Sequence, residues 1–299
     1  MDTNRPNISK RRAWVMAARP KTLPAAVGPV AVGTALAIHA GSFAALPALA
    51  ALTGALLFQI GVNFANDYFD YTKGVDAEDR LGPTRVAQSG LITPGALRTG
   101  IVVVLALAVL DGLYLVTVGG APILAIGLAS IMATLAYSGG PYPLASHGLG
   151  DLFVFLFFGL AAVCGTYYVQ AHTITSTVLA AAVPVGALTT AILVVNNLRD
   201  IKSDRRAGKR TLAVMLGAGK TRLEYAGLVT AAYLIPGALW ASGAFGVWVA
   251  LPWGSLVLAW RAIAAIYRVE SGPEFNRLLA GTAQLSLIFS VLFAIGLVL

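Results

Sequence analysis

Two clusters of amide and carboxylate side chains stand out in a chain that carries few charges. Asn66, Asp67 and Asp70 end one long apolar run, and Asn196 and Asp200 end another. In each cluster an asparagine precedes an aspartate by four residues, which places both side chains on one face of a helix. A carboxylate in hydrocarbon costs about 2.5–3.5 kcal/mol on insertion scales, so acids beside membrane spans usually have a functional reason. The pattern predicts a paired cation site for a polyanionic ligand at a membrane surface.

Oxygen ligands of this kind suit Mg²⁺, which keeps several waters and commonly bridges protein carboxylates to ligand phosphates. Gly74 can end the first helix and turn the chain toward Asp76. Asp204 extends the second cluster by four further residues. Two such sets of oxygens, facing each other, could hold a pair of divalent ions.

Basic side chains accompany both clusters. They are Lys73, Arg80, Arg85, Lys202, Arg205 and Lys209. Their charged groups can grip the oxygens of a diphosphate, and the arginines offer bidentate forks. A simpler alternative is that the acids and bases pair with one another on a solvated face. Two spaced acidic clusters on the same predicted membrane face favour the ligand site.

The composition is that of an integral membrane protein. Of the 299 residues, 58% are hydrophobic and only 11% are charged, against about 25% charged in a soluble domain. A span needs about 20 apolar residues, and nine segments qualify. They are residues 23–40, 46–65, 97–117, 121–138, 151–170, 178–196, 224–242, 247–267 and 278–298. We therefore expect an all-α membrane protein with nine transmembrane helices in a single bundle. The alternation typical of barrel strands is missing.

The distribution of lysine and arginine predicts the orientation of this bundle. Basic residues precede the first span and fill the loops after the second, sixth and eighth spans, whereas the opposite turns contain none. By the positive-inside rule the N-terminus and both acidic clusters face the cytoplasm, so we expect a multi-pass protein of the cell (inner) membrane. The net charge of +8 then belongs to one membrane face, where it also attracts anionic lipid. Nucleic acid is an improbable partner for so apolar a chain.

The two clusters lie 130 positions apart. Residues 1–299 are expected to form one domain, with an internal repeat whose halves cover about 20–140 and about 150–299. The loops 71–96 and 201–223 are the longest polar segments and suit a cytoplasmic cap of short helices over a central cavity. Cys164 is the single cysteine and the three histidines are scattered, so neither a disulfide nor a zinc site is expected.

The motifs resemble those of a known family. Asn66-Asp67-x-x-Asp70 and Asp200-x-x-x-Asp204 are similar to the two aspartate-rich motifs of the UbiA superfamily of intramembrane prenyltransferases. Finer stretches resemble its 1,4-dihydroxy-2-naphthoate prenyltransferase branch, which serves menaquinone biosynthesis. They are RPKTL at 19–23, NDYFDYTKGVD, GPTRVAQSGLITP, GLGD at 148–151 and NNLRDIKSDRRAGKRTLAVMLG.

The resemblance implies a helical bundle around an apolar cavity and a Mg²⁺-dependent reaction. A polyprenyl group would pass from polyprenyl diphosphate to 1,4-dihydroxy-2-naphthoate, with loss of carbon dioxide and diphosphate, giving demethylmenaquinone. The implied metal ligands are Asn66, Asp70, Asp76, Asn196, Asp200 and Asp204, and the catalytic acids are Asp67, Asp70, Asp200 and Asp204. With the bases of the clusters, the candidate substrate-binding residues are Arg19, Lys21, Lys73, Arg85, Tyr137, Tyr142, Lys202 and Lys209. The alternative for the first two is lipid anchoring, and for the tyrosines an interfacial aromatic belt.

One departure separates the chain from many members of the superfamily. Asp76 follows Asp70 by six positions rather than four, which argues against a 4-hydroxybenzoate enzyme and sets Asp76 apart from the ligand position of those members. Prenyl transfer to another aromatic acceptor, such as 4-hydroxybenzoate or homogentisate, is the alternative within the class. An ion-coupled transporter would need acids near the midplane, where only Asp111 qualifies. Asp67 and Asp151 are the candidates for a general base.

Overall fold

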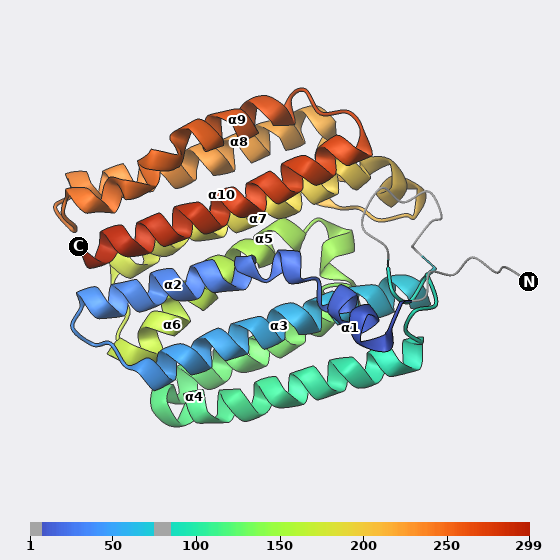
Figure 1. Ribbon diagram of the computed structural model, residues 1–299, viewed down its shortest axis with the longest axis horizontal. Helices are drawn as coiled ribbons and strands as arrows, with labels where there is room; N and C mark the ends of the chain where they lie inside the picture. The colour runs from blue at the N-terminus through green and yellow to red at the C-terminus, as the bar shows by residue number, and fades with distance from the viewer. Residues whose placement is uncertain (1–7, 75–84) are drawn as a thin grey trace, which may run out of the picture.

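The computed structural model describes residues 8–74 and 85–299, and every regular element within these ranges is helical (Figure 1). The α-helical elements are α1 (Lys10–Ala18), α2 (Pro24–His39), α3 (Ala45–Thr72), α4 (Pro94–Ala136), α5 (Gly150–Val154), α6 (Ala162–Ala171), α7 (Ser176–Arg206), α8 (Leu212–Ala241), α9 (Leu256–Ile266) and α10 (Gly272–Val298). Short 3₁₀ segments cover Pro20–Thr22, Leu144–His147 and Val247–Ser255, and a π-helical segment covers Phe155–Ala161.

Helix α4 contains two antiparallel arms. At 1.5 Å per residue its 43 residues would extend about 64 Å, twice the hydrocarbon thickness of a bilayer. Gly120 interrupts it with φ 67° and ψ −152°, a conformation that glycine adopts readily, and Pro122 follows. Figure 1 shows the chain reversing there, so that both arms run along α3. The predicted spans 97–117 and 121–138 are these two arms.

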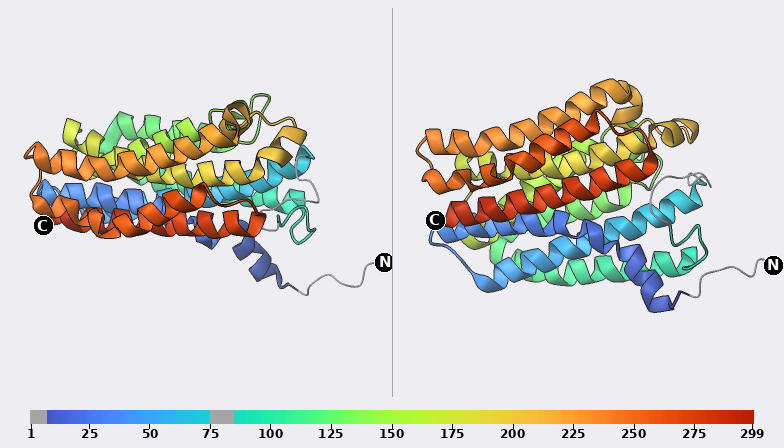
Figure 2. Two further views of the ribbon diagram at one scale, coloured as in Figure 1. Left: turned by 90° about the horizontal axis from the view of Figure 1, so that it is seen from above. Right: turned by 45° about the horizontal axis from the view of Figure 1, so that its top comes forward.

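The number of spans agrees with nine. Six helices are long and apolar enough to cross a membrane, and the bent pair Lys10–Thr22 and Pro24–His39 provides a seventh. That count takes α4 once, so its second arm adds an eighth crossing. Helix α8 is not among the helices counted as apolar enough, but its 30 residues are long enough to cross and it packs along α7, so we take it as the ninth crossing of the described chain. Figure 2 shows these helices from two further sides. The predicted class, an all-α membrane bundle, is confirmed.

Two of the spans differ in detail from the prediction. The span at 151–170 is not one uniform α-helix, because the π-helical segment Phe155–Ala161 separates α5 from α6. There Gly159 lies against Gly186 of α7 so closely that a Cβ on Gly159 would be 2.6 Å from the Gly186 Cα. The span at 247–267 begins as a 3₁₀ helix and continues as α9. Patterns of apolar residues locate spans, but they do not resolve these changes of helical pitch.

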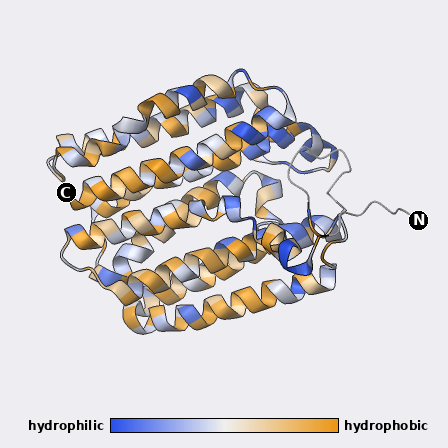
Figure 3. Cartoon of the chain, viewed as in Figure 1, coloured by the Kyte–Doolittle hydropathy of each residue, from blue (hydrophilic) through white to orange (hydrophobic). Residues whose placement is uncertain are grey.

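One end of the bundle is polar. Figure 3 shows hydrophilic residues concentrated at the end where α3 and α7 finish, while the residues along the rest of the helices are mainly apolar. Helix α1 lies at this end, as does the short segment that precedes Gly217 in α8, where φ is 76° and ψ is 164°. Residues 75–84, which contain part of the predicted cap, lie outside the described ranges. Both acidic clusters therefore meet at one end of the molecule.

Candidate active site

A cavity of about 1360 Å³ connects the polar end to the apolar interior of the bundle. Both acidic clusters contribute to its lining, through Asn66, Asp70, Asn196, Asp200 and Asp204. Helix α3 supplies the first two residues and α7 the other three. The four-residue spacing places the members of each set on one helix face. In the folded chain these two faces line the same pocket, although the sets lie 130 positions apart in the sequence.

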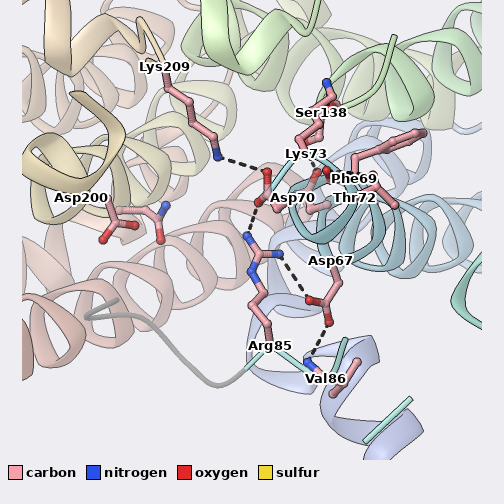
Figure 4. A network of polar contacts seen from close by, with 12 residues as sticks. Asp67, Phe69, Asp70, Thr72, Lys73, Arg85, Val86, Ser138, Asp200 and Lys209 are labelled. Atoms are coloured by element: carbon pink, nitrogen blue, oxygen red, sulfur yellow. Dashed lines mark hydrogen bonds and ion pairs between the residues drawn. The ribbon is translucent and has the colours of Figure 1, made fainter. Parts of the chain in front are cut away.

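Asp70 is the centre of a network of charges (Figure 4). Its Oδ2 accepts a hydrogen bond from Arg85 Nη2 at 2.5 Å, and its Oδ1 pairs with Lys209 Nζ at 3.1 Å. Arg85 is 6% exposed and Lys209 lies between α7 and α8, so the two cations come from different parts of the chain. On the same face, Asn66 Oδ1 accepts a hydrogen bond of 2.6 Å from the Ser138 hydroxyl. Two predicted diphosphate-binding bases thus hold the predicted metal ligand.

Asp67 faces a different environment from Asp70. It is 2% exposed and is not among the cavity-lining residues. Its Oδ2 accepts a hydrogen bond of 3.1 Å from the Val86 amide, and its Oδ1 lies 3.9 Å from Arg85 Nη1. These contacts fasten the segment that carries Arg85 to α3 (Figure 4). Asp67 therefore contributes to the site by positioning Arg85.

Lys73 stands at the end of α3 and ties it to the loop after α4. Its ammonium group donates hydrogen bonds to the carbonyl oxygens of Ser138 at 2.7 Å and Gly140 at 3.4 Å. Burial lowers the pKa of Lys73, the nearby Asp70 carboxylate raises it in part, and Lys209 lowers it further. Lys73 is not a lining residue, so in this arrangement it fixes the loop around Ser138.

The second cluster is organised by Arg199, a residue of the NNLRD stretch to which no role was assigned from the sequence. Its Nε and Nη2 donate to the two carboxylate oxygens of Asp200 at 2.8 and 2.6 Å. Nη2 also donates to Asn196 Oδ1, and Nη1 donates to Asn276 Oδ1 of α10, each at 2.8 Å. Arg199 and Asn276 both line the cavity. A basic residue beside the aspartate was the available signal for Arg199, whereas nothing in the sequence pointed to Asn276.

The structure separates the other predicted site residues into two groups. Arg19, Lys21 and Tyr137 line the cavity. Lys202 and Tyr142 are not among the lining residues. Tyr142 is 57% exposed and stacks on His147, with ring centroids 3.6 Å apart. Asp76 lies outside the described residues.

The polar end of the cavity has an excess of positive charge. Among the described residues that line the cavity there are five bases (Arg19, Lys21, Arg85, Arg199 and Lys209) and four acids, of which Asp70, Asp200 and Asp204 lie at the polar end and Asp111 lies beside Gly54 at the far end. A cavity with this excess attracts a polyanion, and its low-dielectric walls strengthen the attraction.

The oxygen donors at the polar end suit a Mg²⁺ ion that also binds a ligand. They suit less well a metal ion held by protein side chains alone. No three His, Cys, Asp or Glu side chains converge on one point within residues 8–74 and 85–299. Mg²⁺ typically takes one or two carboxylates from the protein and completes its shell with waters and substrate phosphates. Asp70 with Asn66, and Asp200 with Asn196, each offer such a partial set from one helix face.

Below the polar end, the cavity becomes an apolar shaft. Phe153 and Phe157 stack with ring centroids 6.0 Å apart and line its wall. The shaft reaches Gly54, which precedes Asp70 by sixteen residues on α3, a depth of about 24 Å at 1.5 Å per residue. Near its far end, Ile126, Ala161 and Gly165 also line a separate apolar groove of about 460 Å³. The cavity therefore suits a molecule with an anionic head and a long apolar tail.

Known proteins share both the sequence pattern and the fold. The UbiA prenyltransferase family model matches residues 26–298. A 1,4-dihydroxy-2-naphthoate octaprenyltransferase of Haemophilus influenzae is 37% identical, and the match covers 97% of each chain. One of Mycobacterium tuberculosis is 40% identical over 94% of this chain and 95% of that protein. Among solved structures, a UbiA homolog from Archaeoglobus fulgidus bound to DMAPP and Mg²⁺ has a TM-score of 0.65 and 14% identity, covering 95% of this chain and 98% of that one.

Proposed function

This chain belongs to the UbiA prenyltransferase family, and we propose that it transfers a polyprenyl group from polyprenyl diphosphate to 1,4-dihydroxy-2-naphthoate. The products are the prenylated naphthoquinol of menaquinone biosynthesis, carbon dioxide and diphosphate. The observation that carries the proposal is the single cavity in which two asparagine–aspartate sets and five bases stand above an apolar shaft. We infer the acceptor, 1,4-dihydroxy-2-naphthoate, from the names of the relatives from Haemophilus and Mycobacterium.

The basic residues of the polar end bind and orient the diphosphate. Arg85 and Lys209 already lie within 3.1 Å of Asp70, so a diphosphate that approaches this carboxylate meets both cations. Arg199 similarly donates hydrogen bonds to both carboxylate oxygens of Asp200, so it lies where a diphosphate would approach that acid. Charge-assisted hydrogen bonds from these groups stabilise the charge that develops on the departing diphosphate.

Mg²⁺ is the cofactor that these residues would hold. Asn66 and Asp70 on one side, and Asn196, Asp200 and Asp204 on the other, are the ligands to expect. Bound there, Mg²⁺ would neutralise diphosphate oxygens and so lower the barrier to loss of the leaving group. The binding of DMAPP and Mg²⁺ by the Archaeoglobus homolog supports this assignment.

The reaction breaks two bonds and forms one between the ring and the prenyl group. The carbon–oxygen bond of the allylic diphosphate breaks and its electron pair leaves with diphosphate. The electron-rich ring forms a carbon–carbon bond to the allylic carbon at the position that bears the carboxylate. The bond from ring to carboxylate then breaks, its electron pair restores the aromatic ring, and carbon dioxide departs. The apolar shaft keeps water from the reacting carbon, and the stacked rings of Phe153 and Phe157 present π faces that favour positive charge.

An assay with purified protein tests the function directly. Protein in detergent with Mg²⁺, a prenyl diphosphate and 1,4-dihydroxy-2-naphthoate should form prenylated product and release an equal amount of carbon dioxide. 4-Hydroxybenzoate and homogentisate, offered separately, should give little product. Asp70→Ala and Asp200→Ala should abolish turnover while the protein stays folded. Turnover like that of the wild type in either variant would reject the assigned site.

The predicted orientation forms part of the proposal. The polar end, with the active site, faces the cytoplasm, and the turn around Gly41 and Ser42 faces the opposite side. A Ser42→Cys variant is made in a Cys164→Ser background. In intact cells from which any outer membrane has been removed, it should react with a membrane-impermeant maleimide added to the medium. A Lys220→Cys variant should react only after the cells are opened. The reverse pattern would invert the assignment.

A further inference from the structure

Asp151 is a buried acid for which the diphosphate site gives no explanation. It is 6% exposed, and neither of its carboxylate oxygens has a hydrogen-bond partner within the described residues. Most buried polar atoms in proteins are hydrogen-bonded, and burying an unpaired carboxylate is costly. The position in the first turn of α5, where amide groups point toward the side chain, offsets only part of this cost. A buried acid without a partner beside a cavity is therefore a candidate for a functional site.

Asp151 lies directly behind the wall of the cavity. Phe153 and Val154, which follow it in α5, are lining residues, as is Tyr137. The Tyr137 hydroxyl packs against the start of α5, since a Cβ on Gly150 would be 3.2 Å from it. Tyr137 therefore borders the cavity, and its hydroxyl lies at the start of α5, next to the residue that precedes Asp151.

The Tyr137 hydroxyl remains protonated in this setting. Burial raises the pKa of Tyr137, and the carboxylates of Asp151 and Asp70 raise it further. Within the described residues this hydroxyl makes no hydrogen bond, although Tyr137 borders the cavity. A protonated phenol is a hydrogen-bond donor, and the nearby Asp151 carboxylate offers two oxygens that can accept from it. Glu224 of α8 is the other acid close enough to Asp151 to interact with it electrostatically.

We propose that Asp151 is a positioning residue for the aromatic acceptor and acts through Tyr137. When the acceptor binds, Asp151 accepts a hydrogen bond from the Tyr137 hydroxyl, and the Tyr137 oxygen accepts one from a ring hydroxyl of the naphthoate. This chain of hydrogen bonds fixes the ring and shifts electron density from the hydroxyl onto it, which favours attack on the allylic carbon. No proton leaves the site and no additional reactant is needed. The inference rests on the proposed function, because it identifies the substrate hydroxyl that this site receives.

Two properties distinguish this role from a structural one. A carboxylate without a partner destabilises the protein, so the neutral Asp151→Asn side chain should leave the melting temperature unchanged or raise it. The same substitution replaces a charged acceptor by a neutral amide oxygen and should lower kcat/KM for the acceptor by about tenfold, because a hydrogen bond to a charged group is worth about 1–1.5 kcal/mol more than a neutral one. KM for prenyl diphosphate should stay within about twofold of the wild-type value, because Asp151 does not contact that substrate.

The experiment measures both substrates and thermal stability for Asp151→Asn, Tyr137→Phe and the double variant. Because the two residues act as one unit, the double variant should lose little more than either single variant. Asp151→Glu should recover part of the activity. Glu224→Gln serves as the matched control, since it removes a neighbouring acid that is not part of the chain and should leave kcat/KM unchanged.

Three results would overturn the proposal. They are an unaltered kcat/KM in Asp151→Asn, additive losses in the double variant, and a lower melting temperature with equal losses for both substrates. Failure of the proposed function has a different signature, because the wild-type protein would then form no prenylated naphthoate at all. With an active wild type, every outcome bears on Asp151 alone.

Discussion

Replacing Asp70 by asparagine should strengthen the binding of prenyl diphosphate when Mg²⁺ is absent. The substitution keeps the size of the side chain and removes one negative charge from the polar end of the cavity. In the structure this carboxylate forms ion pairs with both Arg85, at 2.5 Å, and Lys209, at 3.1 Å. Without it, the two cations are released to bind phosphate oxygens, and the repulsion between carboxylate and diphosphate disappears.

The size of the effect follows from Coulomb's law. Two unit charges about 6 Å apart interact by about 2.8 kcal/mol at an effective dielectric constant of 20, which is about a hundredfold in Kd. Some of this gain is lost because Arg85 and Lys209 are less well ordered without their anion. We therefore expect Kd to fall by about 10- to 100-fold in EDTA. With Mg²⁺ present the variant should gain no further affinity, since a metal ligand is missing, and turnover should fall by at least about a thousandfold.

Isothermal titration of geranyl diphosphate into detergent-purified protein, with EDTA and then with Mg²⁺ at constant ionic strength, measures both effects. Asp111→Asn is the matched control. Asp111 approaches Gly54, about 24 Å along α3 from Asp70, so the same charge change should alter Kd by no more than about threefold. Weaker binding of Asp70→Asn in EDTA, together with a preserved response to Mg²⁺, would refute this account of the site.

Three further substitutions test other parts of the structure. Lys209→Met should weaken the binding of geranyl diphosphate in EDTA by about tenfold, because it removes a partly buried cation from the site; titration measures it. Gly159→Ala should destabilise the protein by about 1–3 kcal/mol, because the new Cβ would lie 2.6 Å from a backbone atom of α7; thermal unfolding measures it. Gly165→Leu should lower turnover of octaprenyl diphosphate more than that of geranyl diphosphate, because it fills the far end of the shaft between cavity and groove; product formation with each donor measures it.

Each of these changes has a control within the chain. Lys220→Met removes an exposed lysine and should leave binding unaltered. Gly127→Ala adds a Cβ with no atom within 4 Å and should not affect unfolding. For Gly165→Leu the short donor is the control. Equal effects in a variant and its control, or equal losses for both donors, would contradict the corresponding prediction.

The sequence predicted the spans well because the information for them is local. A run of apolar residues, its length and the absence of charge determine where a helix crosses hydrocarbon, and Gly120 with Pro122 marks the reversal inside α4. Spacings of four residues likewise placed Asn66 with Asp70, and Asn196 with Asp200, on common helix faces. Both inferences depend only on the geometry of one helix.

Contacts between distant segments could not be predicted in this way. Lys209 pairs with Asp70 across 139 positions, whereas the equally plausible Lys202 does not line the cavity. Arg199 donates to Asn276 of α10, which lies 77 positions later in the chain, and no spacing within either helix encodes this contact. Asp67, next in sequence to Asn66, turns instead toward Val86 and leaves the cavity to its neighbours.

By itself, then, the sequence determined an apolar helical bundle with two oxygen-rich faces at one of its ends, because helix period and hydrophobicity act over a few residues. Only the tertiary structure decided which cations meet those oxygens, which tyrosine borders the cavity, and which acid remains buried without a partner. These outcomes depend on how ten helices pack against one another in the described chain, and packing joins residues whose separation in sequence carries no periodic signal.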